Sequence, residues 1–248
     1  MIGCINWFKY SSPPAFYPVA GVVAPWFFAA AAILGAAGLY LGFFVAPTDA
    51  QQGEAYRIIY ILVAAAWMSM FIYLVMAFWA GIGLAFNTRL SSMMASALAP
   101  TGALMTFIAL WTGALWGKPT WGTWWVWDAR LTSELILLFL YLGFISLQAA
   151  IDDPRRADKA GAVLALVGVV NVPIIYFSVQ WWNTLHQGAS VSLTKSPSMA
   201  ATMLMGMLVM ALAFWMYSIG ASLMRVRAII LERERHTDWA KGIQEGRS

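Results

Sequence analysis

Six stretches of mostly apolar residues, each near the length that crosses a bilayer, restrict this chain to a membrane fold. They cover residues 26–45, 58–84, 95–115, 131–151, 162–179 and 201–224. A helix of about 20 apolar residues spans the hydrocarbon core of a membrane. Of the 248 residues, 61% are hydrophobic and 10% are charged, whereas soluble domains average about 45–50% and about 25%. The sequence therefore predicts an all-α integral membrane protein, a single membrane domain with six transmembrane helices.

The lysines and arginines are shared unequally between the two sets of connectors that join these spans. Of the 15 in the chain, eleven lie in the N-terminal segment, the second and fourth connectors and the C-terminal segment 225–248. Cytoplasmic segments of membrane proteins carry the excess of positive charge. Both termini are therefore predicted in the cytoplasm, with 225–248 as a cytoplasmic tail. Because the charges lie in connectors rather than on one face, they do not indicate nucleic-acid binding.

The third connector, 116–130, contains an unusual concentration of tryptophan. Five of the chain's 14 tryptophans lie within it: Trp116, Trp121, Trp124, Trp125 and Trp127. An aromatic belt at the membrane interface accounts for one or two tryptophans at a helix end, but not for five beside the turn-forming residues Gly117, Pro119 and Gly122. The alternative is a flat aromatic platform in a periplasmic loop, on which a planar apolar ligand stacks.

Charged residues accompany these tryptophans. Lys118 and Arg130 are placed to pair with propionate-type carboxylates at the polar edge of such a ligand. Asp128 precedes the fourth span, where it either caps the helix or contributes to the ligand site. Glu134 lies one turn further along, and it either extends to the membrane interface or supports the loop from below. Both pairs of alternatives stay open at the level of sequence.

The chain has two histidines, and only one lies on the predicted side of the tryptophan segment. His236 falls in the charged C-terminal segment, where a solvated side chain is expected. His186 lies in the fifth connector, shortly after Trp181 and Trp182. Neutral imidazole is a common axial ligand of haem iron. His186 is therefore predicted as the metal ligand of a haem site that includes Trp181 and Trp182.

Other classes of function find little support in the sequence. The single cysteine, Cys4, excludes CxxC redox chemistry. The chain has no GxxxxGK[ST] phosphate loop, so ATP hydrolysis would have to come from a partner. The spans contain no histidines for an electron-carrying cytochrome and few of the polar residues that transporters place in the membrane. The alternatives to a haem-handling protein are a structural subunit, or a haem or solute permease of an ABC-type assembly.

The segment from Phe107 to Tyr141, which includes WGKPTWGTWWVWDARLTSELILLFLY, resembles the tryptophan-rich WWD signature of haem-handling proteins. With RIIY at 57–60, VNVPII at 170–175 and WWNTLHQG at 181–188, the whole chain is similar to the CcmC family of the cytochrome c maturation system. The resemblance implies a non-enzymatic protein of the bacterial inner membrane that binds haem b at the periplasmic face and delivers it to the haem chaperone CcmE. It also implies a membrane complex with CcmA, CcmB and CcmD.

The resemblance further implies two histidine ligands to iron, one on each side of the tryptophan segment. His186 matches the second of these histidines. Leu62 occupies the position of the first, and Ala64 occupies the position of a nearby proline. Because leucine has no lone pair to offer iron, this chain is expected to bind haem more weakly or with a single protein ligand.

Overall fold

The computed structural model describes residues 11–182 and 199–244, and every regular element in these ranges is helical. Six segments are long and apolar enough to cross a membrane: Pro13–Val45, Glu54–Phe86, Arg89–Trp121, Ala129–Ala150, Pro154–Trp181 and Ala201–Arg233. This confirms the predicted fold class, an all-α membrane protein with six spans.

In the described part of the chain, the spans are built from nine helical elements, which include one π-helical and one 3-10-helical turn, and a short helix follows the last span. In chain order they are α1 (Pro13–Tyr40) with the π-helical turn η2 (Leu41–Val45), the 3-10 turn η3 (Glu54–Ile58) leading into α2 (Ile59–Phe86), α3 (Arg89–Trp121), α4 (Ala129–Ala150), α5 (Pro154–Gly168), α6 (Asn171–Trp181), α7 (Ala201–Arg233) and α8 (Asp238–Gln244).

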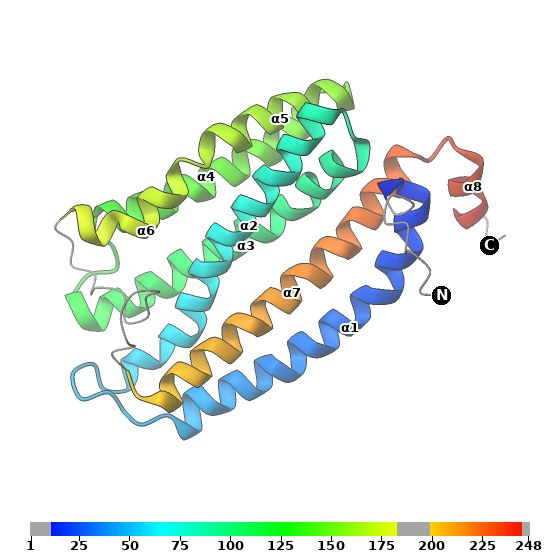
Figure 1. Cartoon of the computed structure of the whole chain (residues 1–248). Coiled ribbons are helices and arrows are strands. Elements are labelled where there is room, and N and C mark those ends of the chain that lie inside the picture. The colour runs from blue at the N-terminus through cyan, green and yellow to red at the C-terminus, as the bar shows by residue number, and fades with distance from the viewer. Residues whose placement is uncertain (1–10, 183–198, 245–248) are drawn as a thin grey trace, which may run out of the picture.

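Helices α2 and α3 pack against each other and form the middle of the molecule (Figure 1). The pair α1 and α7 covers one side, and α4 with α5 and α6 covers the other. Close approach between α3 and α4 depends on Gly102, because a methyl group added there would lie 2.1 Å from Cζ of the fully buried Tyr141. Tyr141 in turn meets Tyr73 of α2 edge to face, with the ring centroids 5.1 Å apart.

The bundle has two distinct ends, because an even number of spans returns the chain to its starting side. The start of α1 and the end of α7 lie together at one end, termed here the terminal end (Figure 1). The loop between α3 and α4 and the end of α6 lie at the other, termed the tryptophan end, which holds residues 116–128, 181 and 182.

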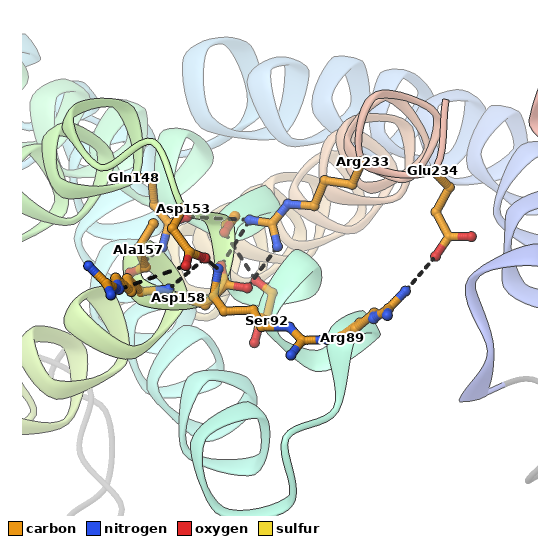
Figure 2. A network of polar contacts seen from close by, with 11 residues as sticks. Arg89, Ser92, Gln148, Asp153, Ala157, Asp158, Arg233 and Glu234 are labelled. Carbon is orange, nitrogen blue, oxygen red and sulfur yellow. Dashed lines mark hydrogen bonds and ion pairs between the residues drawn. The ribbon is translucent and has the colours of Figure 1, made fainter. Parts of the chain in front are cut away.

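At the terminal end, a polar network ties α7 to the helices on the far side of the bundle (Figure 2). Arg233 donates two hydrogen bonds, of 2.7 and 2.9 Å, to the carboxylate of Asp158 on α5, and a longer one of 3.4 Å to Gln148 on α4. These three residues are termed the terminal clasp. Nearby, Arg89 at the start of α3 pairs with Glu234 at 3.8 Å.

The helices differ from the predicted spans mainly at their ends. α1 begins at Pro13 rather than at residue 26, because proline needs no backbone hydrogen bond in the first turn of a helix. α3 continues to Trp121 and α4 starts at Ala129, so the first part of the predicted connector 116–130 is helical. The fifth span is divided at 169–170, just before Asn171 and Pro173.

Candidate functional site at the tryptophan end

Trp116 anchors the tryptophan end to the connector between α1 and α2. Its ring is only 9% exposed, and its Nε1 donates a 2.9 Å hydrogen bond to Oε1 of Gln52. Gln52 is held in place in turn, because its backbone N–H donates to the Asp49 carboxylate at 2.8 Å. Trp121 packs edge to face against Trp116, with the centroids 4.9 Å apart. The first connector and the end of α3 therefore form one packed unit.

A sharp turn at Gly122 ends α3 and directs the chain back over the helix. Gly122 has φ +78°, a left-handed conformation that favours glycine, and its N–H donates to the Lys118 carbonyl at 3.1 Å. The Lys118 Nζ donates to the Gly122 carbonyl at 3.2 Å and lies 5.9 Å from the ring centroid of Trp124. Gly117 lets the returning chain pass, because a methyl group there would lie 3.1 Å from the Thr123 carbonyl oxygen.

The tryptophans of the following loop differ in exposure. Trp124 is 54% exposed and Trp127 is 77% exposed, whereas Trp125 is partly buried. Trp125 and Trp127 meet at 75° rather than lying in one plane, with their centroids 5.4 Å apart. The Nε1 of Trp125 is buried and has no hydrogen-bond partner among the residues that the structure describes. The indole faces left for a ligand in this loop are therefore mainly those of Trp124 and Trp127.

The start of α4 is fixed by two carboxylates. Asp128 is the N-cap residue, and its Oδ1 accepts a 2.8 Å hydrogen bond from the backbone N–H of Leu131. Arg130 follows in the first helical turn and is partly buried. Glu134 is buried, and its Oε1 lies 2.7 Å from Oγ of Ser69 on α2. Glu134 is thus tied to α2 inside the bundle and does not extend to the interface, which excludes one of its two predicted roles.

Helix α6 brings two further tryptophans to this end. The Asn171 side chain donates a 2.8 Å hydrogen bond to the Ser133 carbonyl, which fixes the start of α6 beside the first turns of α4. From there α6 runs to the tryptophan end, where Trp181 is 57% exposed and Trp182 is 50% exposed. The structure thus brings these two rings to the same end as the 122–128 loop. His186, the predicted iron ligand, lies outside the described residues.

Leu62 and Ala64, which replace the expected histidine and proline, face different neighbours. Leu62 approaches α3, because a methyl group added to Gly113 would lie 3.8 Å from its Cδ1. Gly113 precedes Trp116 by one helical turn, so position 62 lies beneath the tryptophan segment. Ala64 is fully buried and packs with Met210 and Ala213 of α7.

Two residues of this site had no clear signal in the sequence. Gln52 lies in a short polar connector, and Ser69 is an isolated hydroxyl within an apolar span. Their partners, Trp116 and Glu134, are 64 and 65 positions away along the chain. Within 11–182 and 199–244, the structure contains no cluster of three or more histidine, cysteine or acidic residues that could hold a metal ion.

Comparison with known proteins places these features in one family. Residues 6–241 match the family model described as "CcmC: Heme exporter protein C". The chain is 48% identical over 228 residues to "Heme exporter protein C" of Escherichia coli (strain K12), a match that covers 92% of this chain and 91% of that protein. It is 49% identical over 224 residues to the protein of the same name from Bradyrhizobium diazoefficiens, covering 90% and 84%.

A match to a eukaryotic protein is shorter. The chain is 51% identical over 159 residues to the "Putative cytochrome c biosynthesis ccmC-like mitochondrial protein" of Marchantia polymorpha, covering 64% of this chain and 67% of that protein. The family model spans nearly the whole chain, including all six spans and the tryptophan segment. The chain therefore belongs to the heme exporter protein C (CcmC) family.

Proposed function

We propose that this chain binds haem b at the periplasmic face of the bacterial inner membrane and delivers it to CcmE during cytochrome c maturation. The observation that carries the proposal is the gathering of four half- to largely exposed indoles, from two separate segments, at one end of the bundle: Trp124, Trp127, Trp181 and Trp182. Large exposed aromatic surface of this kind marks a binding site. The names of the relatives, which refer to haem export and cytochrome c biosynthesis, support the same ligand.

The exposed indoles offer enough binding energy to hold a macrocycle without a covalent bond. Burying a whole tryptophan side chain removes about 150–250 Å² from water. Since Trp124, Trp181 and Trp182 are already about half covered, a ligand gains about 2–3 kcal/mol from each of them at roughly 25 cal/mol per Å². Lys118 retains hydrogens beyond the one bonded to Gly122, so it is able to pair with a propionate, as is Arg130.

His186, four residues beyond Trp182 in the sequence, is the proposed iron ligand. His236 follows α7 at the terminal end, and position 62 is leucine. Trp116, Trp121 and Trp125 shape the site from within, and Asp128 positions it by capping α4. With one imidazole, the protein is expected to hold haem more weakly than with two, and each 1.4 kcal/mol of binding energy changes affinity about tenfold.

The proposed topology places the terminal end in the cytoplasm and the tryptophan end in the periplasm. The terminal end carries Arg89, Arg155, Arg156, Lys159, Arg233 and Arg235, which fits the positive-inside rule. The chain acts as a non-enzymatic subunit of a complex with CcmA, CcmB and CcmD, in which a partner hydrolyses ATP. A purely structural subunit and a haem or solute permease are the competing functions.

Haem titration of the purified chain in lipid nanodiscs tests this proposal. The double variant Trp124→Ala, Trp127→Ala is expected to bind haem about tenfold or more weakly, since it loses two of the four exposed rings. Trp26→Ala is the matched control, because Trp26 is 75% exposed but lies on α1, away from this site. A structural subunit would give the same haem affinity, or none, for all three proteins.

A further inference from the structure

The kink in the fifth span leaves a gap beside α2. α5 packs against both α2 and α4, whereas α6, after the break at 169–170, packs chiefly against α4. The hydrogen bond from Asn171 to the Ser133 carbonyl holds α6 in this direction. The chain beyond the kink therefore diverges from α2 as it approaches the tryptophan end, and a space opens between α6 and α7.

This space is an apolar groove of about 740 Å³, within the roughly 300–1,000 Å³ of ligand pockets in proteins. α2 forms its floor, α6 one wall and α7 the other. The residues lining it are Trp67, Met68, Met70, Phe71, Leu74, Val172, Pro173, Tyr176, Phe177 and Trp215. Five of these ten are aromatic, and two are methionines, whose thioether sulfur is a ligand type that haem iron accepts.

The groove opens sideways at the depth of the hydrocarbon core. Leu74, Phe71, Tyr176 and Trp215 on its rim are all between 41% and 44% exposed. Its floor begins 8 residues after the start of α2, about 12 Å along the helix at 1.5 Å per residue. A bilayer core is about 30 Å thick, so the groove lies within the membrane and communicates with lipid rather than with water.

An unbroken series of rings leads from this groove to the tryptophan end. Tyr176 contacts Phe177 with centroids 4.9 Å apart. Phe177 stacks on Trp181 at 5.2 Å and 19°, and Trp181 contacts Trp182 at 5.8 Å. All four residues lie on α6 or at its end. A ligand that lies against Tyr176 and Phe177 is therefore next to Trp181 and Trp182, two of the exposed indoles of the candidate site.

We propose that this groove takes up haem, a planar and largely apolar tetrapyrrole, directly from the bilayer, and that the ring series 176–182 leads it to the tryptophan end. The proposal rests on the proposed function, since it supplies the route by which the ligand reaches that site. An acyl chain needs only an apolar surface, whereas aromatic faces and thioethers together favour a flat macrocycle with a metal centre. Because the groove adjoins the exposed indoles, such a ligand reaches the tryptophan end without crossing water.

Filling the groove tests the route separately from the binding site. Leu74→Trp adds bulk inside the groove, and Leu142→Trp is its control, because Leu142 has the same 43% exposure but lies on α4, outside the groove. Each protein is reconstituted in phosphatidylcholine vesicles that already contain haem, and the rate of binding is followed by the shift of the haem Soret band. The equilibrium affinity for haem added from water is measured in parallel.

We expect Leu74→Trp to slow uptake from the bilayer about tenfold or more while keeping the equilibrium affinity within about twofold. Leu142→Trp should alter neither quantity. Uptake by Leu74→Trp at the unmodified rate would overturn the route and assign the groove to acyl chains only. If Leu74→Trp does not fold, Trp215→Ala takes its place, because it removes one wall of the groove without adding bulk. Slower uptake at unchanged affinity would then support the route, and uptake at the unmodified rate would overturn it. If the unmodified chain binds haem neither from the bilayer nor from water, the proposed function itself is overturned.

Discussion

Replacement of Asp128 separates the two roles that its position allows, helix cap and ligand contact. Its Oδ1 accepts a 2.8 Å hydrogen bond from the Leu131 N–H where the tryptophan loop joins α4. Asp128→Ala removes that acceptor and the negative charge at the helix N-terminus. Asp128→Asn keeps an acceptor oxygen of the same reach and removes only the charge. If the cap is the role that matters, the asparagine variant should behave nearly like the unmodified protein.

The expected size of the effect follows from the cap. Loss of an N-cap side chain costs about 1 kcal/mol of stability, which lowers the melting temperature of a chain of this size by roughly 2–4 °C. The same 1 kcal/mol is a factor of about five in an equilibrium. Asp128→Ala should therefore weaken haem binding by at most about fivefold, through loosening of the loop and the first turn of α4. Asp128→Asn should stay within about twofold.

Asp153 provides a matched control at the opposite end of the molecule. It caps α5 in the same way, with its Oδ1 accepting from the Arg155 N–H at 2.8 Å. Asp153→Ala should lower the melting temperature as much as Asp128→Ala does, without changing the affinity for haem. Melting temperature is followed by far-ultraviolet circular dichroism, and affinity by titration with haem, on the same nanodisc preparations.

The opposite result would mean that the charge of Asp128, rather than its cap, decides haem binding. That result would be a loss of about tenfold or more in haem affinity for Asp128→Asn, equal to the loss for Asp128→Ala, with its melting temperature unchanged. Asp128 would then act on the ligand or on a neighbouring cation, and its bond to Leu131 would be incidental to the site.

Three further predictions concern the packing and the iron. Gly102→Ala forces a methyl group against Tyr141 and should destabilise the fold by about 1–3 kcal/mol, whereas Gly242→Ala, where the added methyl group meets no side chain within 4 Å, should not lower the melting temperature. Arg233→Ala breaks the terminal clasp and should lower the melting temperature. Haem affinity should stay the same, because the clasp lies at the end opposite the tryptophans. A loss of affinity would show that the two ends are not independent. Leu62→His should give bound haem the absorption spectrum of a six-coordinate low-spin iron. If the unmodified chain already shows that spectrum, the leucine at this position has not removed an iron ligand.

The fold class is predictable here because the lipid environment imposes a strong requirement on sequence. A span must be apolar over about 20 residues, and six such stretches are visible without any knowledge of packing. The helix ends are harder, because proline signals the start of a helix in some contexts and interrupts it in others. Pro13 starts α1, Pro119 lies within α3, and the turn after α3 is made by Gly122 alone.

The site is only partly predictable, because exposure depends on tertiary contacts. The sequence presents five equivalent tryptophans in 116–130, but the structure buries Trp116 against Gln52 and leaves Trp127 largely exposed. The role of Glu134 is undecided in the sequence for the same reason, since its partner Ser69 belongs to another span. Local spacing identifies the kind of site, whereas contacts between distant segments decide which side chains remain for a ligand.

The most direct test of this account is an experimental structure of the haem-loaded chain in a lipid nanodisc. The predicted result is a macrocycle held between the 122–128 loop and Trp181–Trp182, with an imidazole nitrogen of His186 on the iron and its propionates toward Lys118 or Arg130. A macrocycle bound elsewhere, or His186 placed too far from the exposed indoles to share one ligand with them, would contradict the account.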